Sequence, residues 1–385
     1  MDSHNAHKRS WRCIQRRNRH RIIGLCTDGA RRRPAASRTP HVSTARSDSK
    51  TLGLSTWDEV AGNQMNRRSR IFQNRDVFWR KLMIKTPFGS KSTADEVLAG
   101  LDLSDRTVVV TGCSGGIGFE TMRALSAKGA RVIGIARSLN KAQNACLRTD
   151  TQATAVGCDQ SDLQSVIHAA DFISERFEKI DVIVANAGIT GSKQATTRDG
   201  IEMQFLVNYL SHFLLVNKLL PKLPDKKGRV VIVSSSASKN QAPKEGIRFD
   251  DLDGHRDYSA SKFYGQSKLA LSIFAGELSR RLAPRGIVVN SLHPGAVRGT
   301  DLNRSIQFPV SLVLSIAELF FKTASQGAAT QCLLAASPLV EGVSGQYWAD
   351  CQITGGSKYL TDLVMAERLW RTSEELLVRK LNVGG

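Results

Sequence analysis

Tyr264 and Lys268 stand four residues apart, so in a helix their side chains project from the same face. A free tyrosine hydroxyl has a pKa near ~10 and exchanges protons poorly at neutral pH. A lysine ammonium one turn away favours the phenolate and is expected to lower that pKa. Such a pair can pass a proton to or from an alcohol or carbonyl oxygen while another group moves a hydride.

A second pair with the same spacing, Tyr258 and Lys262, lies just upstream. Apolar residues recur at helical period after Lys268, which predicts a helix over residues 264–282. Tyr258 then has to lie at or before the start of this helix. We therefore expect the chemistry at Tyr264 and interpret Tyr258 as a wall residue.

The elements that position these residues follow from the hydrophobic pattern after residue 101. Short apolar runs recur at 108–110, 132–135, 182–184, 230–233 and 287–289, and amphipathic segments separate them at about 116–128, 161–177, 200–219 and 264–282. Continuous β-branched runs suit strands that are buried on both faces. Residues 83–385 are therefore predicted to form one α/β domain, a Rossmann-type, doubly wound parallel sheet with helices on both faces.

A glycine-rich segment joins the first predicted strand to the first helix. It runs Thr111-Gly112-Cys113-Ser114-Gly115-Gly116-Ile117-Gly118. Glycines let a backbone turn tightly and approach a pyrophosphate, whose charge is stabilised at a helix N-terminus. The strand before it and the helix after it predict a dinucleotide site.

The ends of the second and third strands indicate which dinucleotide binds. Arg137 follows the second strand, where an acidic residue would bind the ribose 2′-hydroxyl of NAD and a cation accommodates the 2′-phosphate of NADP. NADP(H) is therefore predicted, with NAD(H) left open; the alternative is a solvent-facing arginine. Asp159 follows the third strand, where its carboxylate could meet the adenine or cap a helix.

Residues 1–82 differ in composition from the rest of the chain. Residues 1–80 hold 18 Lys and Arg against 6 Asp and Glu, a net charge of +12 out of +19, without a sustained hydrophobic period. Such a basic segment is predicted to be disordered. Three explanations remain open: an organelle transit sequence, a tail for nucleic acid or an anionic membrane, or a translated start placed upstream of the true one at Met65 or Met83.

The remaining composition bounds the class of protein. The mild charge of the globular part gives no indication of nucleic-acid binding through this domain. Seven cysteines, without a Cys-x-x-Cys pair or a neighbouring histidine, indicate reduced thiols in an intracellular, cytoplasmic protein and predict no metal site. No apolar run reaches the ~18–20 residues of a transmembrane helix.

Several motifs together resemble the short-chain dehydrogenase/reductase family, in particular its branch of retinol dehydrogenases and the WW-domain-containing oxidoreductase. The resemblance covers about residues 87–377. The glycine segment is similar to the family's cofactor turn, and Asn186-Ala187-Gly188 to the signature that closes over the cofactor. His293-Pro294-Gly295-Ala296-Val297 resembles the turn beside the nicotinamide, although Gly299 precedes Thr300 as an apparent insertion.

The resemblance implies a catalytic tetrad of Asn208, Ser235, Tyr264 and Lys268. In it, Tyr264 transfers the proton, Ser235 binds the substrate oxygen, Lys268 holds the nicotinamide ribose, and Asn208 anchors a relay water in a kinked helix. Three serines, 234–236, stand together, and only the family alignment selects Ser235. For Asn208, a satisfied interior amide is the alternative. The predicted cofactor contacts are Gly112, Ser114, Gly116, Ile117, Gly118, Arg137, Asp159, Asn186, Ala187, Gly188, Tyr264, Lys268, Pro294, Gly295 and Val297.

The expected function is NADP(H)-dependent interconversion of a hydrophobic alcohol and its aldehyde or ketone. An apolar segment at 305–323 resembles the family's substrate lid, and its alternatives are a core helix or a patch that contacts a membrane surface or a second subunit in a homodimer. A protein of another class also fits: an NADP(H)-binding regulatory or interaction protein with the same fold and little turnover.

Overall fold

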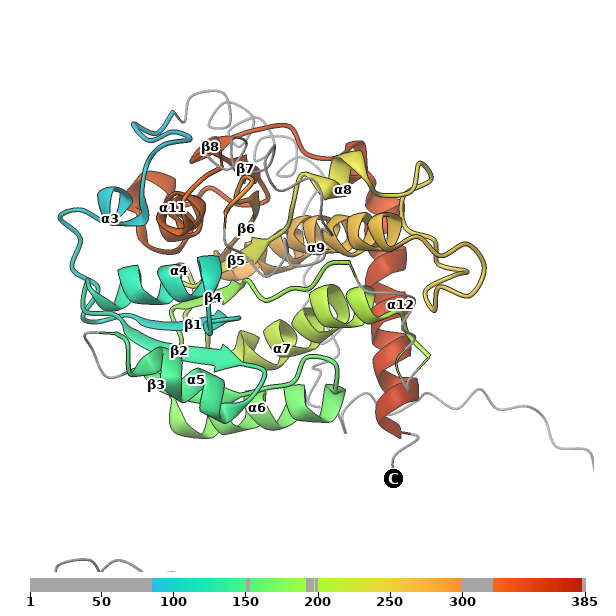
Figure 1. Ribbon diagram of the computed structural model, residues 1–385, viewed down its shortest axis with the longest axis horizontal. Helices are drawn as coiled ribbons and strands as arrows, with labels where there is room; N and C mark the ends of the chain where they lie inside the picture. Colours follow the sequence, from blue (N-terminus) through green and yellow to red (C-terminus); the bar gives the residue numbers. More distant parts are fainter. Residues whose placement is uncertain (1–84, 150–152, 192–196, 198–199, 299–320, 383–385) are drawn as a thin grey trace, which may run out of the picture. The chain divides into compact units, whose positions relative to one another are not determined.

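The structure is a computed structural model that describes residues 85–149, 153–191, 197, 200–298 and 321–382. An eight-stranded sheet organises this part of the chain, in the order β3-β2-β1-β4-β5-β6-β7-β8 (Figure 1). Its strands are β1 (Thr107–Thr111), β2 (Arg131–Ala136), β3 (Thr154–Gly157), β4 (Val182–Ala185), β5 (Arg229–Val233), β6 (Val288–His293), β7 (Tyr347–Ala349) and β8 (Gln352–Ile353). All neighbouring pairs are parallel except β7 and β8. The predicted Rossmann-type sheet is confirmed.

Helices cover both faces of the sheet. One face packs against α3 (Ala94–Val97), α4 (Gly116–Ser126), α5 (Leu139–Cys146) and α11 (Ala324–Ala336). The other packs against α6 (Leu163–Arg176), the π-helical turn η2 (Phe205–Leu210) that continues into α7 (Ser211–Leu219), α9 (Ala260–Leu282) and α12 (Leu363–Asn382). Short turns of helix complete the list: η3 (Leu220–Lys222), α8 (Ala237–Asn240), η4 (Ala283–Arg285), η7 (Pro338–Val340) and η8 (Lys358–Thr361).

The strands alternate between these two layers because successive side chains point to opposite faces. Val108 and Val110 of β1 join the core beside α4 and α11, whereas Val109 between them joins the core beside α6, α7 and α9. All three are at most 1% exposed. Burial on both faces explains why these strands appear in the sequence as unbroken apolar runs.

The helix that carries the catalytic pair begins earlier than its apolar period predicts. α9 starts at Ala260, and Ser259 caps it by accepting a hydrogen bond from the Lys262 amide. Tyr258 precedes the cap, so the prediction that it lies outside the helix is confirmed. The predicted kink near Asn208 takes the form of the π-helical turn η2, which widens the helix immediately before α7.

Five helices of the described residues, α3, α5, α8, α11 and α12, and two strands, β7 and β8, were not predicted. α11 carries no amphipathic signal because its residues from Gly327 to Ala335 are all buried. Strands β7 and β8 are only three and two residues long. The basic segment 1–82, the domain boundary after it and Thr300 lie outside the described residues, as does most of the predicted lid at 305–323. No helix in the described ranges combines the length and apolar composition of a membrane span.

Candidate active site

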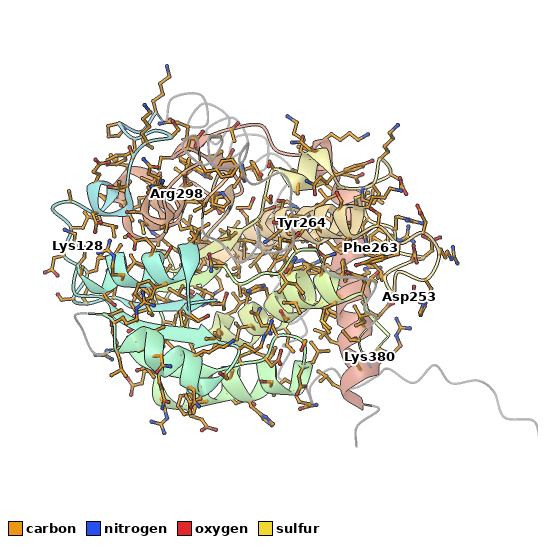
Figure 2. All side chains as sticks on the ribbon, in the orientation of Figure 1. Lys128, Asp253, Phe263, Tyr264, Arg298 and Lys380 are labelled. Carbon is orange, nitrogen blue, oxygen red and sulfur yellow. The ribbon has the colours of Figure 1, made fainter. Side chains whose placement is uncertain are left out.

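The predicted site residues meet at the edge of the sheet where the parallel strands end. Thr111 ends β1, Ala185 ends β4 and Val233 ends β5, and each leads directly into a predicted motif. In open parallel sheets, ligands bind outside these carboxyl ends. Tyr264 reaches this edge from the first half of α9 (Figure 2).

The Tyr264 phenol is partly buried and hydrogen-bonds to the Ser235 side chain. Burial raises its pKa above the usual value, and the hydrogen bond with Ser235 only partly opposes this. The expectation that Lys268 lowers the pKa is therefore wrong in its net direction, because desolvation of the phenolate outweighs the other effects. The phenol is protonated at neutral pH, the form that donates a proton.

Lys268 follows Tyr264 by one turn of α9 and is only 5% exposed. Its Nζ donates to the Val233 carbonyl oxygen at 3.1 Å and stands 5.9 Å from the centre of the Tyr264 ring. Burial lowers the pKa of this ammonium to about 8. An ammonium has three donors, so two remain for a ligand above the strand end.

The three consecutive serines have different surroundings. Ser234 is buried and donates to the Lys268 carbonyl oxygen at 2.7 Å, which ties β5 to α9. Ser236 is exposed. Ser235 lies between them, accepts from the Ala237 amide at 3.2 Å and contacts Tyr264. The structure therefore brings Ser235, and neither of its neighbours, to the phenol.

Tyr347 of β7 was not among the predicted site residues. Its hydroxyl donates to the Ser235 carbonyl oxygen at 3.1 Å, and its ring is 8% exposed. It lies close enough to Tyr264 for a charge on that phenol to raise the Tyr347 pKa. In the sequence, Tyr347 falls within residues 87–377, which resemble the family, but it belongs to none of the motifs singled out there.

Asn208 is completely buried in the turn η2. Its Oδ1 accepts from the Ile189 amide at 2.7 Å, and its Nδ2 donates to the Ile189 carbonyl at 3.0 Å and to Ser267 Oγ at 2.9 Å. Both side-chain donors are used, so the amide is a satisfied interior group that holds the segment after Gly188 against α9. A relay water remains a prediction, and the Asn208 side chain has no donor left to bind it.

The glycine segment forms a tight turn before α4. Gly112 has φ +73°, and a Cβ there would lie 2.9 Å from Ala187 Cα. A Cβ on Gly118 would lie 2.3 Å from the Gly112 carbonyl oxygen and 2.4 Å from Asn186 Nδ2. Only glycine permits this approach of the two segments.

The N-terminus of α4 suits a pyrophosphate. Gly115 is its cap residue and forms no side-chain cap hydrogen bond, and a Cβ at this position would meet nothing within 4 Å. Ser114 is exposed beside it, and Gly116, with φ +54°, begins the helix. Open space next to uncapped amide groups fits the dinucleotide that the motif predicts.

The segment Asn186-Ala187-Gly188 forms the adjoining wall. The Asn186 and Ala187 amides both donate to Thr111 Oγ1 at 2.9 Å, and Asn186 Nδ2 donates to the Thr111 carbonyl at 2.9 Å. A Cβ on Gly188 would lie 3.2 Å from Lys268 Nζ, so this backbone lies over the ammonium. Thr111 thus joins the glycine turn to the Asn-Ala-Gly segment.

The turn after β6 forms the opposite wall. Gly295 has φ +92°, and a Cβ there would lie 2.8 Å from the Cδ atom of Lys322. The ammonium group of Lys322 pairs with Asp350 at 2.5 Å. Pro294 precedes it. Val297 is 6% exposed, and a Cβ on Gly327 of α11 would touch both Val297 and Ile117. The Pro-Gly turn and the glycine turn therefore approach one another across α11.

Arg137 and Asp159 lie farther along the same edge, directly after β2 and β3. Arg137 is exposed. Asp159 Oδ1 accepts from the amide and the hydroxyl of Ser161 at 3.0 and 2.7 Å. The alternative in which Asp159 caps a helix is wrong, because Asp162 is the cap residue of α6.

The second tyrosine–lysine pair, Tyr258 and Lys262, has a different environment. The Tyr258 hydroxyl donates to Glu202 at 3.4 Å, and its ring stacks on Phe263. Burial, followed by the Glu202 charge, raises the Tyr258 pKa to about 12. Lys262 is half exposed and pairs with Asp257 at 3.0 Å.

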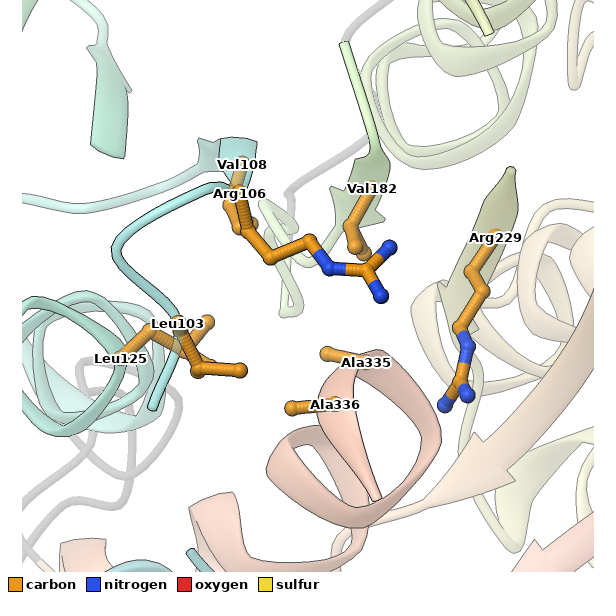
Figure 3. A pocket seen from close by; sticks show the side chains of 8 residues that line it. All are labelled: Leu103, Arg106, Val108, Leu125, Val182, Arg229, Ala335 and Ala336. Carbon is orange, nitrogen blue, oxygen red and sulfur yellow. The ribbon is translucent and has the colours of Figure 1, made fainter. Parts of the chain in front are cut away.

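A small cavity lies at the opposite edge of the sheet, where β1, β4 and β5 begin (Figure 3). Arg106 and Arg229 stand at its rim, and Arg229 donates to carbonyl oxygens of Leu334 and Ser337 near the end of α11. These bonds give Arg229 a structural role, so we do not assign the cavity to the active site.

Comparison with known proteins places the chain in a family. A family model described as short chain dehydrogenase matches residues 106–247. The short-chain dehydrogenase TIC 32 B, chloroplastic, of Brassica napus is 36% identical over 307 residues, which are 76% of this chain and 95% of that protein. This chain belongs to the short-chain dehydrogenase/reductase family.

Other relatives support the branch within the short-chain dehydrogenases. Retinol dehydrogenase 14 of Mus musculus is 39% identical, covering 71% of this chain and 86% of that protein. The WW domain-containing oxidoreductase of Danio rerio is 33% identical, and the match covers 81% of this chain and 79% of that protein. The protein is thus an oxidoreductase of the class that acts on CH–OH groups, in the retinol dehydrogenase-like branch.

Solved structures share the fold of the described residues. A short chain dehydrogenase from Burkholderia cenocepacia, in complex with NADP, is 27% identical with a TM-score of 0.51 and covers 64% of this chain and 95% of that one. A blue fluorescent protein from a metagenomic library, in complex with NADPH, is 25% identical with a TM-score of 0.51. The match covers 66% of this chain and 96% of that one.

Proposed function

We propose that this protein is an NADP(H)-dependent dehydrogenase that interconverts a hydrophobic alcohol and its aldehyde or ketone, with Tyr264 as the general acid and base. The observation that carries the proposal is the contact of Ser235 with the Tyr264 phenol, whose ring centre lies 5.9 Å from the Nζ of buried Lys268, at the same edge of the sheet as the uncapped N-terminus of α4.

The nucleotide is held by residues that follow β1 and β2. The α4 amides and the glycine turn bind its pyrophosphate, and the exposed guanidinium of Arg137 binds the 2′-phosphate. The NADP and NADPH in the two solved relatives support this choice. When bound, NADP(H) donates or accepts the hydride.

The chain's own residues move the proton. Ser235 accepts from the Ala237 amide, and its single hydroxyl hydrogen, which faces the Tyr264 phenol in the structure, turns to the substrate oxygen when substrate binds. Tyr264 gives its proton to that oxygen during reduction and takes one back during oxidation. The two free donors of Lys268 bind the nucleotide ribose, and its charge stabilises the phenolate that forms.

The substrate class is inferred from the branch of the family. Retinol dehydrogenase 14, 39% identical, is named for an apolar alcohol. The apolar segment 305–323 is our predicted lid over such a substrate.

Homodimer formation and contact with a membrane surface also remain predictions, which sedimentation and vesicle flotation can test. Organelle targeting by residues 1–82 gains support from a relative named as chloroplastic, and a fluorescent fusion would test it.

The test follows NADPH absorbance with the full-length protein and a panel of carbonyls, from long apolar aldehydes to small polar ketones. We expect Tyr264→Phe to lose general acid–base catalysis, a decrease of at least ~10²-fold in kcat, with little change in NADPH affinity. Tyr258→Phe is the matched control and should keep most activity.

Three results would contradict parts of the proposal. The reverse behaviour of the two tyrosine variants would move the chemistry to Tyr258. A preference for small polar carbonyls would refute the apolar substrate. Tight NADPH binding without turnover of any carbonyl would favour the alternative, a regulatory NADP(H)-binding protein.

A further inference from the structure

His212 lies completely buried on α7, one helical turn after Asn208. Its Nδ1 stands 2.7 Å from the Asn208 carbonyl oxygen, and its Nε2 stands 2.9 Å from Thr111 Oγ1 and 3.0 Å from Gln160 Nε2. One imidazole therefore touches the turn that carries Asn208 and the residue that begins the glycine turn.

The hydrogen bonds around Thr111 determine which nitrogen of His212 carries the proton. Thr111 Oγ1 already accepts from the amides of Asn186 and Ala187. A hydroxyl has two acceptor positions and one hydrogen, so its hydrogen points to His212 Nε2. Gln160 Nε2 is also a donor toward the same nitrogen. Nε2 is therefore the acceptor, and Nδ1–H donates to the Asn208 carbonyl.

This arrangement requires a neutral imidazole. Burial lowers the His212 pKa to about 4, the bond to the Asn208 carbonyl opposes this, and the charge of Lys268 lowers it further. The ring thus keeps one tautomer at neutral pH and holds both neighbours at the same time.

We propose that His212 is a positioning residue that couples the cofactor turn to the catalytic turn, acting through Thr111 on one side and Asn208 on the other. The inference rests on the proposed function. Through Thr111, the ring sets the orientation of the hydroxyl that holds the Asn-Ala-Gly segment. Through the Asn208 carbonyl, it holds the π-helical turn. The Asn208 side chain in this turn binds Ile189 and Ser267, and Ser267 is the residue next to Lys268.

Two substitutions separate the two bonds. In His212→Gln the side-chain oxygen can take the place of Nε2 and accept from Thr111, while the donor to the Asn208 carbonyl is lost. In His212→Asn the side-chain nitrogen can take the place of Nδ1 and donate to that carbonyl, while the bond to Thr111 is lost. The matched control is His168→Asn on α6, where the histidine is exposed.

The experiment measures the NADPH dissociation constant, kcat and melting temperature of each full-length variant, with the best carbonyl of the panel. His212→Gln should lower kcat about tenfold, because the Asn208 turn is freed, and keep the dissociation constant within about twofold. His212→Asn should raise the dissociation constant about tenfold and keep kcat at saturating NADPH within about threefold. His168→Asn should change neither.

Equal changes in both constants for the two variants, or changes in melting temperature alone, would overturn the coupling and leave His212 as a core residue. These results are distinct from failure of the proposed function, which would appear as wild-type protein that neither binds NADPH nor reduces any carbonyl. His212→Leu removes both bonds and should show both losses; the Gln and Asn variants decide the question if the Leu variant does not fold.

Discussion

Replacing Lys268 with methionine should make the protein more stable at neutral pH while it removes the ammonium that the proposed chemistry needs. Lys268 is 5% exposed, and burial lowers its pKa from the ordinary 10.5 to about 8. Each unit of pKa corresponds to about 1.4 kcal/mol, so keeping this ammonium charged in the fold costs about 3 kcal/mol at pH 7. Methionine has a similar volume and no charge. The lost bond to the Val233 carbonyl offsets about 1–2 kcal/mol, which leaves a gain of about 1–2 kcal/mol.

The sign of the pH dependence follows from the proton balance. Between pH 8 and 10.5 the unfolded chain holds the Lys268 proton and the native state has lost it, so wild-type stability rises with pH across this window. The advantage of Lys268→Met should therefore be largest at or below pH 8 and should shrink toward pH 10.5.

Urea denaturation at about pH 7 and about pH 9.5 measures both parts of this prediction. Lys262→Met is the matched control, because Lys262 is half exposed and paired with Asp257 at the surface, and it should change stability little at either pH. A Lys268→Met protein that is less stable than wild type at pH 7, or whose advantage does not change with pH, would refute the conclusion that burial dominates at Lys268.

Two further predictions concern the nucleotide site. Gly118→Ala forces a Cβ to 2.3 Å from the Gly112 carbonyl oxygen, so it should destabilise the fold by about 1–3 kcal/mol, measured by thermal melting. Gly89→Ala, with nothing within 4 Å of the added carbon, is the control, and equal melting temperatures for the two variants would contradict the argument. Arg137→Ala should weaken NADPH binding about tenfold, through loss of a charge-assisted hydrogen bond, and leave NADH binding unchanged in fluorescence titrations. An equal loss for both nucleotides would return Arg137 to a solvent-facing role.

The regular part of the fold could be predicted from the sequence because its signals are local. Strands buried on both faces require continuous apolar runs, and these mark β1, β2, β4, β5 and the region of β6. The glycine turn is recognisable because close backbone approach excludes a Cβ, as the contacts at Gly118 show. The different positions of the two tyrosines also follow from local period, since Tyr258 precedes the cap residue Ser259 and Tyr264 lies within α9.

Other features depend on residues that only folding brings together. Three adjacent serines are alike in sequence, and Ser235 differs from Ser234 only because Ser234 turns to the backbone of α9, 34 residues away. The pKa of Tyr264 rises because several elements bury the phenol, although its neighbour at i+4 suggested the opposite direction. Helix α11 could not be predicted from amphipathic period because it is buried on all sides.

The sequence by itself determined the sheet, the nucleotide turn and the helix that carries Tyr264 and Lys268, because backbone propensity and hydrophobic period act over a few residues. Only the tertiary structure decided how the side chains are charged and paired. Desolvation and hydrogen bonding depend on every element that packs against a group, and the bond from the Thr111 hydroxyl to His212 joins residues 101 positions apart.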